Sequence, residues 1–571
     1  MVNITIDNIN LMVPKGTSIL NAAKEACIEI PTLCFLKEIN EIGACRACVV
    51  EIEGLDRLVT SCNNIVEDGM VIKTNSKKVR RNRRTTVEML LSIHDCNCAT
   101  CERSGNCKLQ TLANNLHILE IPYEKKIERK SWNQNFPLIR DSSKCIKCMR
   151  CIQICDKVQG LNVWDLVGTG SRSTVGVARN KKIEDANCSL CGQCITHCPV
   201  GALRARNDNE QVWREIEDSN KVVVVQVAPA IRTAWGEAFG LNAKEATIGK
   251  AVDALRRLGF DHVFDTSFSA DLTIMEEANE FVKRFTSGDL KKYPMFTSCC
   301  PAWVRFIESQ YPEMLSQLST AKSPQQMFGS VMKTYYAKFL GIDPKDMVTV
   351  SIMPCVAKKD EATMEFEFEG VKGHETDYSL TTREFIRMIK SANINPNSLK
   401  ESECDTLMHD YTGAGVIFGT TGGVMEAALR TAYKIITGKN ADADAFNVVR
   451  RKTANQSVTE AEFDINGIKV KTAVVSGLAE VRKLVEAIKS GKASYDFVEA
   501  MACPGGCVGG GGQPINDGEE MAYLRGETLY YLDSHAPIRY SHENKDVEKL
   551  YKDYLGKPIG ERAHHLLHRE Y

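Results

Sequence analysis

The sequence predicts a multidomain protein of α+β and α/β class, in which small cysteine-rich modules precede one large α/β domain. Its 571 residues are several times the ~100–200 residues of a typical domain. Of the 23 cysteines, 17 lie in the first 200 residues, and the next cysteine after Cys198 is Cys299. From about residue 210, apolar strand-like segments alternate with helical segments, which is typical of α/β architecture.

The composition excludes several classes of protein. Lys and Arg number 72 against 73 Asp and Glu, so no bulk charge attracts nucleic acid or anionic lipid. No apolar run approaches the ~20 residues of a membrane span, and the start MVNITIDNIN has no features of an export signal. We therefore expect a cytoplasmic protein without nucleic-acid or membrane partners, whose cysteines bind metal rather than form disulfides.

The first module is expected over residues 1–78. Alternating apolar residues predict strands around Ile4 and Leu11, and a short helix is expected over Ser18–Ala26. The cysteines form C-x10-C-x2-C with a distant fourth, which is similar to the plant-type [2Fe–2S] ferredoxin arrangement apart from its longer first gap. Four thiolates also suit zinc, so both metals stay open here. The candidate ligands are Cys34, Cys45, Cys48 and Cys62.

The second module, residues 79–125, places one histidine and four cysteines within fourteen residues. The candidate ligands are His94, Cys98, Cys101 and Cys107, whereas Cys96 alternates with Cys98 and is the poorer candidate. This set could hold zinc or an iron–sulfur cluster, and the motif alone does not choose between them.

The third module, residues 126–209, contains the pattern C-x2-C-x2-C-x3-C twice. This is the bacterial two-cluster ferredoxin pattern, in which the fourth cysteine of each run ligates the other cluster. One [4Fe–4S] cluster is expected at Cys145, Cys148, Cys151 and Cys198, and the other at Cys188, Cys191, Cys194 and Cys155. Three consecutive modules of this kind predict an electron-transfer chain.

The large domain is expected over residues 210–571. Helices are expected over Lys250–Leu258, Ser323–Lys338 and Asp271–Phe285. The expected strands are Lys221–Ala228, Val263–Asp265, Met295–Thr297, Val348–Met353, Val416–Phe418 and Ala473–Val475. A Gly-rich stretch at 413–423 lacks the residues of a phosphate-binding loop.

Four cysteines of this domain follow apolar strand-like segments: Cys300, Cys355, Cys503 and Cys507. Sites in open α/β sheets form beyond the carboxyl ends of strands. We therefore expect the four thiolates to meet at one crevice and to hold a [4Fe–4S] cluster at the end of the electron-transfer chain.

The peptides TSCCPAW (297–303), MPCVAKKDE (353–361) and MACPGGC (501–507) resemble the three signature loops of the [FeFe]-hydrogenases. The resemblance covers the whole chain and fits the clostridial, ferredoxin-linked, multi-cluster type. It implies a β-grasp [2Fe–2S] module, three accessory [4Fe–4S] clusters of which one has His/Cys3 ligation, and a two-lobed catalytic domain. It also implies an H-cluster, whose [4Fe–4S] half is bridged by Cys507 to a diiron half carrying CO, cyanide and azadithiolate.

The resemblance further implies roles for single residues. Pro229, Ala230, Ser323, Gln325, Met353 and Met501 would line the diiron pocket, and Lys358 would balance the charge of cyanide. Protons would pass along Arg284, Glu280, Ser319, Glu277 and Cys299. From the helical pattern alone, the three charged residues of this path form a solvated face. Ala302 and Pro504 depart from the residues that many relatives carry.

The implied function is the reversible reduction of protons to H2 by a monomer that takes electrons from ferredoxin or flavodoxin and needs hydrogenase maturation proteins. A basic run between Lys77 and Arg84 predicts the docking site of an acidic carrier. One alternative is an iron–sulfur subunit like that of NADH dehydrogenase, against which the TSCCPAW loop argues. The other is a non-catalytic iron–sulfur electron-transfer or assembly protein.

Overall fold

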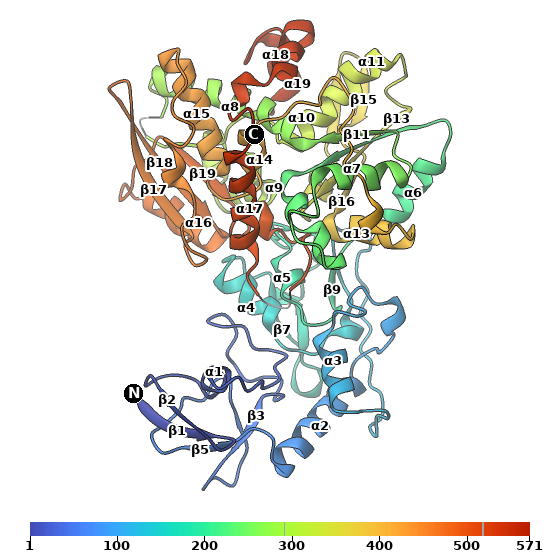
Figure 1. The fold of residues 1–571 in the computed structure, drawn as a ribbon, viewed down its shortest axis with the longest axis vertical. Helices are drawn as coiled ribbons and strands as arrows, with labels where there is room; N and C mark the ends of the chain where they lie inside the picture. The colour runs from blue at the N-terminus through green and yellow to red at the C-terminus, as the bar shows by residue number, and fades with distance from the viewer. Residues whose placement is uncertain (291, 517–518) are drawn as a thin grey trace. The chain divides into compact units, whose positions relative to one another are not determined.

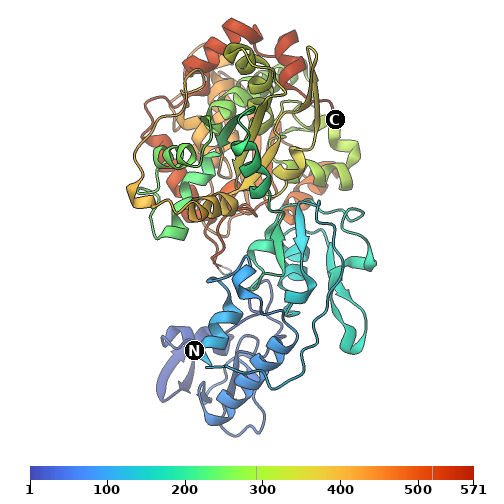
Figure 2. The same ribbon diagram turned by 90° about the vertical axis from the view of Figure 1, so that its right-hand side faces the viewer.

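The computed structural model describes residues 1–290, 292–516 and 519–571 (Figure 1). The chain forms two compact units. The first comprises residues 1–157, 162–186 and 197–204, and the second comprises residues 158–161, 187–196 and 205–571. Figure 2 presents the same ribbon from a second side. Within the described residues, no helix is both long and apolar enough to cross a bilayer.

The first unit opens with a five-stranded sheet in the order β2-β1-β5-β3-β4. The two predicted strands form a hairpin that pairs Ile6 with Ile9 through a tight turn, and the side chains of Ile4, Ile6 and Ile72 pack in the core with helix α1. The helix expected over Ser18–Ala26 is present, with Ser18 as its N-cap. The elements are β1 (Val2–Ile6), β2 (Ile9–Val13), α1 (Ile19–Glu25), β3 (Val49–Ile52), β4 (Val59–Thr60) and β5 (Val71–Lys73).

The remainder of the first unit consists of short elements joined by cysteine-bearing loops. They are α2 (Lys77–Ser92), α3 (Lys108–Asn115), β6 (Leu138–Arg140), α4 (Arg150–Lys157), β7 (Trp164–Val167) and β8 (Thr174–Val177). Strands β7 and β8 form an antiparallel hairpin in which Trp164 pairs with Val177.

The second unit contains two separate four-stranded sheets. The first sheet, β11-β10-β13-β16, is parallel throughout. In the second, β12-β19-β18-β17, only β17 is antiparallel. The strands are β10 (Val222–Val227), β11 (His262–Asp265), β12 (Met295–Phe296), β13 (Met347–Met353), β16 (Tyr378–Thr381), β17 (Val458–Ile465), β18 (Ile468–Ser476) and β19 (Phe497–Met501), beside a small hairpin of β14 (Glu365–Phe368) and β15 (Val371–His374).

Helices cover both sheets of the second unit. Helices α7 and α13 pack with β10 and β13 in one core, and α8 and α10 contribute to a core that includes Val224. The helices are α5 (Gln193–Thr196), α6 (Asn209–Glu217), α7 (Ile248–Arg257), α8 (Thr266–Ser287), α9 (Pro301–Gln310), α10 (Pro324–Val331), α11 (Ala337–Leu340), α12 (Lys358–Glu361), α13 (Thr382–Ser391), α14 (Gly413–Ile417), α15 (Gly423–Thr437), α16 (Leu478–Lys489), α17 (Ala522–Ser534), α18 (Lys545–Leu550) and α19 (Glu561–Leu567). The two-lobed α/β architecture agrees with the sequence-based expectation.

One predicted strand, Val416–Phe418, is wrong, because its residues lie in and after helix α14. The apolar run is short, and such runs do not distinguish a buried strand from a buried helix. Two glycines of helix α14 explain how closely it packs against its neighbours. A Cβ at Gly413 would lie 2.2 Å from Asp533 Oδ1, and one at Gly415 would lie 2.4 Å from the Ser267 carbonyl oxygen. These glycines therefore allow α14 to pack closely against α17 and α8.

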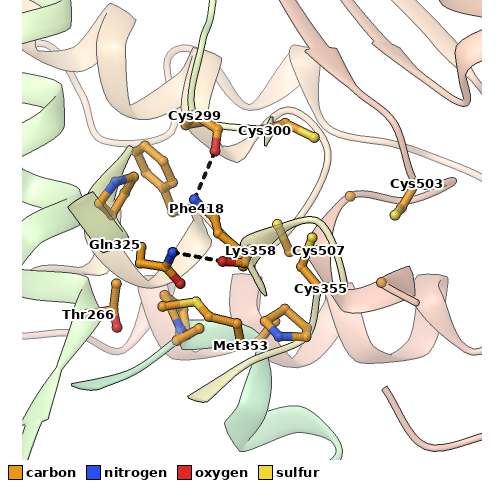
Figure 3. A pocket seen from close by; sticks show the side chains of 18 of the residues that line it. Thr266, Cys299, Cys300, Gln325, Met353, Cys355, Lys358, Phe418, Cys503 and Cys507 are labelled. Carbon is orange, nitrogen blue, oxygen red and sulfur yellow. Dashed lines mark hydrogen bonds between the residues drawn. The ribbon is translucent and has the colours of Figure 1, made fainter. Parts of the chain in front are cut away.

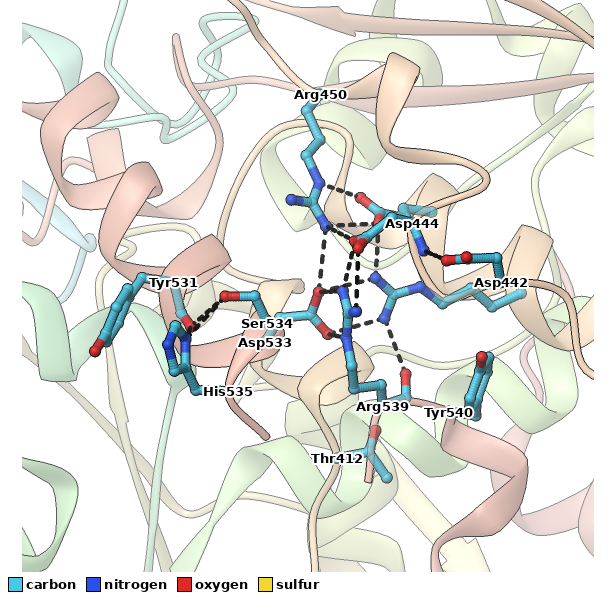
Figure 4. Close-up of polar contacts among 12 residues, drawn as sticks. Thr412, Asp442, Asp444, Arg450, Tyr531, Asp533, Ser534, His535, Arg539 and Tyr540 are labelled. Carbon is cyan, nitrogen blue, oxygen red and sulfur yellow. Dashed lines mark hydrogen bonds and ion pairs between the residues drawn. The ribbon is translucent and has the colours of Figure 1, made fainter. Parts of the chain in front are cut away.

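A buried ionic cluster fixes α17 against α15 (Figure 4). Arg430 donates to both carboxylate oxygens of Asp533, at 2.9 and 2.8 Å, and all three side chains of Arg430, Asp533 and Glu426 are fully buried. Arg450 and Arg539 extend the cluster. Burial alone would raise the pKa of Asp533, but hydrogen bonds from Arg430 and Arg539 outweigh it and lower that pKa.

Asp533→Ala should lower the free energy of unfolding by about 3–5 kcal/mol, because it leaves the Arg430 charge buried without its main partner. Asp444→Ala is the matched control. Its carboxylate also contacts Arg539, at 2.8 Å, but its side chain is 53% exposed. The control should cost less than about 1 kcal/mol. Urea denaturation of the intact protein measures the free energy of unfolding of both variants. Equal losses of stability would contradict a larger contribution from the buried Arg430–Asp533 pair.

Candidate functional site

A buried pocket of about 70 Å³ lies between the two sheets of the second unit (Figure 3). Cys300 follows β12, Cys355 follows β13, and Cys503 and Cys507 follow β19, so the pocket is at the carboxyl ends of these strands. All four cysteines line it, and Figure 3 shows their side chains around a common space. This is the convergence that the strand-end argument predicts.

The four thiols lie in an environment that opposes ionisation. Burial raises the pKa of Cys355 to about 12 and raises the pKa of Cys300, Cys503 and Cys507 as well. Such thiols stay protonated unless a positively charged metal group displaces the protons. A set of four thiols around one cavity therefore fits an iron–sulfur group in its donor chemistry.

Lys358 is the cation of this pocket. Its Nζ donates to Glu361 at 2.7 Å and to the Cys299 carbonyl oxygen at 3.4 Å, and only 8% of the residue is exposed. Its charge acts against burial by lowering the pKa of Cys300, Cys355 and Cys507. Lys358 is therefore placed to stabilise anionic ligands at the pocket.

The predicted pocket residues fall into two groups. Pro229, Ala230, Gln325, Met353 and Met501 line the cavity, together with Cys299 and Lys358. Ser323 instead caps helix α10 and donates to Glu361 at 2.9 Å, so it reaches the pocket through the partner of Lys358. Of the two departures from relatives, Ala302 lines the cavity, and Pro504 is not among the lining residues.

Sequence reasoning missed Thr266 and Phe418, which also line the pocket. Thr266 directly follows β11, so the strand-end rule could have found it. The strand-end rule does not apply to Phe418, because this residue follows helix α14 and not a strand.

Helix α8 carries the acidic residues of the expected proton path. Ser319 donates to Glu280 at 2.8 Å, and Arg284 lies 3.3 Å from the other Glu280 oxygen. Glu277 is completely buried, and neither of its carboxyl oxygens has a partner in hydrogen-bonding geometry. The interpretation of these residues as a solvated face, drawn from the pattern alone, is wrong, because other segments of the second unit cover that side of the helix.

Burial raises the pKa of Glu277 to about 8, with the charges of Glu280 and Glu499 adding to the effect. Near neutral pH this carboxyl group therefore carries a proton. Burial is the largest cause of the raised pKa of Cys299, and Glu277 adds to it once its own carboxyl group ionises at higher pH. A protonated carboxyl group thus lies within electrostatic range of the thiol at the pocket.

The four cysteines of the first module are buried and converge. The Cys34 side chain lowers the pKa of Cys45, and the Cys62 side chain lowers the pKa of Cys48, so the thiols lie close together in two pairs. Arg83 donates to the carbonyl oxygens of Ala47, Val49 and Thr74, at 3.0, 3.2 and 3.2 Å, and so fixes the loop of Cys45 and Cys48.

His94 has the hydrogen bond expected of a metal ligand. Its Nδ1 lies 3.0 Å from the carbonyl oxygen of Lys144, and this contact orients the ring and leaves Nε2 for a metal. The Cys96 thiol instead donates to the His94 carbonyl oxygen at 3.3 Å. The carbonyl oxygen of Cys198 accepts a bond of 3.2 Å from Arg103, whose electrostatic neighbours include Cys101 and Cys107.

Cys145, Cys148, Cys151 and Cys198 line one cavity of the first unit. The two ferredoxin-like runs share an unusual backbone. Lys147 and Met149 have φ of 55° and 64°, and the equivalent Leu190 and Gly192 have 58° and 71°. Such turns direct successive N–H groups at an anion, as in a cluster cradle. The other predicted set combines Cys155 of the first unit with Cys188, Cys191 and Cys194 of the second.

Asn40 joins two of the predicted cluster sites in the first unit. Its side-chain nitrogen donates to the carbonyl oxygens of Cys34, at 2.8 Å, and Cys148, at 3.0 Å, and the residue is completely buried. Among the described residues, no three His, Cys, Asp or Glu side chains lie close enough to chelate a single metal ion.

Within the second unit, the segment of Cys188–Cys194 contacts the loop of the pocket cysteines. The Cys503 thiol lies 3.7 Å from the Cys191 carbonyl oxygen. A Cβ at Gly511 would lie 2.5 Å from that oxygen and 2.5 Å from Gly192 Cα. The two backbones meet this closely only because both residues are glycine.

Five family models match the chain. "Iron only hydrogenase large subunit, C-terminal domain" matches residues 221–511, and "Iron hydrogenase small subunit" matches 519–571. A "2Fe-2S iron-sulfur cluster binding domain" matches 1–77. The "NADH-ubiquinone oxidoreductase-G iron-sulfur binding region" matches 83–122, and the "NADH-quinone oxidoreductase subunit 3, ferredoxin-like domain" matches 137–204.

Similar proteins extend over the full chain. "NADP-reducing hydrogenase subunit HndD" of Solidesulfovibrio fructosivorans is 45% identical, over 100% of this chain and 99% of its own length. "Iron hydrogenase 1" of Clostridium pasteurianum is 40% identical over 100% of both chains. The solved structure of an apo [FeFe]-hydrogenase HydA1 variant from Chlamydomonas reinhardtii superposes with a TM-score of 0.57 at 40% identity, covering 64% of this chain and 98% of that one.

Gly511→Ala should slow electron transfer between the cluster expected at Cys188–Cys194 and the one expected at the pocket, because the added methyl group pushes the two loops apart. Freeze-quench paramagnetic resonance after mixing with a reductant measures this rate. Gly341→Ala is the control, since a Cβ there meets nothing within 4 Å. An unchanged rate in Gly511→Ala would show that the close approach has no part in electron transfer.

Proposed function

This chain belongs to the [FeFe]-hydrogenase, or iron-only hydrogenase, family, and from that premise we propose that it interconverts protons and H2 at an H-cluster held by Cys300, Cys355, Cys503 and Cys507. The convergence of four buried thiols on one cavity, with Lys358 beside them, is the observation that carries the proposal. The matches over the full chain support the same chemistry.

When bound, the H-cluster supplies a redox-active iron at which two electrons and two protons combine. The chain supplies its surroundings. The apolar lining from Pro229, Ala230, Met353 and Met501 excludes water. The Lys358 ammonium group is a compact positive charge that would stabilise anionic ligands of the cluster. Glu361 holds that ammonium group and also accepts hydrogen bonds from Ser323 and Gln325, both at 2.9 Å.

We further propose the proton path Arg284, Glu280, Ser319, Glu277 and Cys299. The first three are linked by hydrogen bonds, and Ser319 also acts on the pKa of Glu277. A buried carboxyl group with a pKa near 8 can give and take protons close to neutral pH. Cys299 lines the pocket next to the ligand Cys300, but adjacent side chains in an extended segment point apart. Its thiol is therefore free to exchange protons with the site.

Cys299→Ser should keep every cluster but lose at least about 100-fold of turnover in both directions, because a hydroxyl group has a far higher pKa than a thiol. Cys299→Asp should recover part of the rate. Cys404→Ser should be nearly silent, because that residue packs against the core of the first sheet. Gas chromatography of H2 with reduced dye measures all three. Full activity of Cys299→Ser with intact clusters would refute the path.

For the electron donor we propose a small acidic carrier such as ferredoxin or flavodoxin, docking on helix α2 beside the [2Fe–2S] module. Lys77, Arg80 and Arg81 are exposed there. Arg83 belongs to the same run in sequence, but it is buried and holds backbone carbonyl groups, so it takes no part in the surface. Electrons would then cross the accessory clusters to the pocket.

Replacing Lys77, Arg80 and Arg81 together by Glu should slow ferredoxin-linked H2 evolution about tenfold at low salt and weaken its salt dependence. Activity with a small dye should not change. The control replaces the exposed Lys545, Lys549 and Lys552 by Glu, which alters net charge equally. Equal losses with ferredoxin and dye would contradict docking at α2.

The similarity to an NADP-reducing hydrogenase subunit favours a second candidate, in which the same site exchanges electrons with NADP(H) through partner subunits. Assays of the purified chain separate the two. H2 evolution from reduced ferredoxin by the chain alone supports the first candidate. Evolution that requires NADPH and a co-purifying subunit supports the second. Either candidate needs dedicated maturation proteins, because no side chain can generate CO or cyanide.

A further inference from the structure

The segment Leu567–Arg569, at the end of helix α19, pairs with residues 320–322. These residues directly follow Ser319 of the proposed proton path. The Lys322 amide donates to the Leu567 carbonyl oxygen at 2.8 Å, and the Arg569 amide donates to the Thr320 carbonyl oxygen at 2.7 Å. Ala321 and His568 form an antiparallel bridge. This pairing brings a residue from the region matching the small-subunit family model next to the path.

The His568 side chain bridges two elements. Its Nδ1 lies 2.7 Å from Thr320 Oγ1 and its Nε2 lies 2.9 Å from Glu276 Oε2, and only 7% of the residue is exposed. A carboxylate only accepts hydrogen bonds, so Nε2 donates to Glu276, while Nδ1 forms the hydrogen bond with the Thr320 hydroxyl group. Tyr551 and the Ile559 amide also donate to Glu276, which is completely buried.

Thr320 is in turn a partner of the proton path. Its amide donates to both carboxylate oxygens of Glu280, at 3.2 and 3.0 Å, beside the Ser319 hydroxyl bond of 2.8 Å. Glu276 and Glu280 lie one turn apart on the same helix, α8. His568 therefore links Thr320 to Glu276 on helix α8. This link lies one helical turn from the hydrogen bonds that Ser319 and the Thr320 amide donate to Glu280.

We propose that His568 is a positioning residue for proton transfer, which holds Ser319 and the Thr320 amide against Glu280. This inference rests on the proposed proton path. It gives the small-subunit-like segment a part in the reaction, because that segment supplies His568, Tyr551 and Ile559 around Glu276. His568 itself does not touch the pocket and exchanges no proton with it.

Two variants test the proposal in the holoenzyme. His568→Ala removes both contacts of the ring, and Thr320→Val removes only the hydroxyl partner while keeping the side-chain shape and the amide. Each should lower H2 turnover about tenfold through misalignment of the transfer step. The solvent isotope effect should rise, because proton transfer becomes rate-limiting. The double variant should be no slower than His568→Ala, since both changes break one link. His565→Gln is the control on an exposed neighbour.

Amide hydrogen exchange supplies a readout that does not need turnover. In both variants, exchange in a peptide covering residues 316–322 should speed up at least about tenfold, whereas peptides of α7 should not change. Unchanged exchange and turnover in Thr320→Val would overturn the proposal, and so would losses of the two variants that multiply in the double variant. If Cys299→Ser keeps full activity, the proton path is wrong. In that case, faster exchange without a loss of turnover would leave His568 a purely structural clamp and overturn its role in proton transfer.

Discussion

Strands β12, β13 and β19 end at one buried pocket, and the remaining features of the site depend on this convergence. It places four thiols where water cannot stabilise their charge, so that burial raises the pKa of each of them. Only a positively charged group can make them ligands there. The same environment makes the charge of Lys358 effective, because nearby charges interact more strongly when water is excluded. The glycine contact between residues 192 and 511 then brings the next predicted cluster segment to this pocket.

Helix α8 connects the pocket to the exterior of the second unit. Thr266 at its start lines the cavity, and Arg284 near its end bonds the carbonyl oxygens of Ser316 and Leu318. Neighbouring acids on this helix lie in different surroundings. Glu276 is fully hydrogen-bonded by the segment after residue 519, whereas Glu277 has no hydrogen-bond partner and carries a raised pKa. In the proposed proton path, one helix thus combines a structural anchor, Glu276, with a group that would exchange protons, Glu277.

Cysteine spacing and strand ends predicted much of this molecule, because both depend on local sequence. The strands around Ile4 and Leu11 and the meeting of Cys300, Cys355, Cys503 and Cys507 are as expected, and so are most strands of the two sheets, although β16 and β17 were not predicted. Local pattern failed where distant segments decide the outcome. Glu277 belongs to a charged helix face that distant residues cover, as the contact of Glu280 with Thr320, forty positions away, illustrates. Arg83 sits in a basic run, yet it is buried by the loop of Ala47. The packing of helix α14, which contains Val416, depends on the contact of Gly413 with the distant Asp533.

We propose that the pocket cysteines hold a diiron-containing H-cluster rather than an iron–sulfur cluster alone. Infrared spectroscopy of the intact chain, produced with the maturation proteins, tests it most directly. We expect stretching bands of both CO and cyanide that shift between the oxidised sample and the sample reduced under H2. A fully loaded protein, with iron and sulfide present but neither CO nor cyanide bands, would contradict the account and identify a non-catalytic iron–sulfur protein.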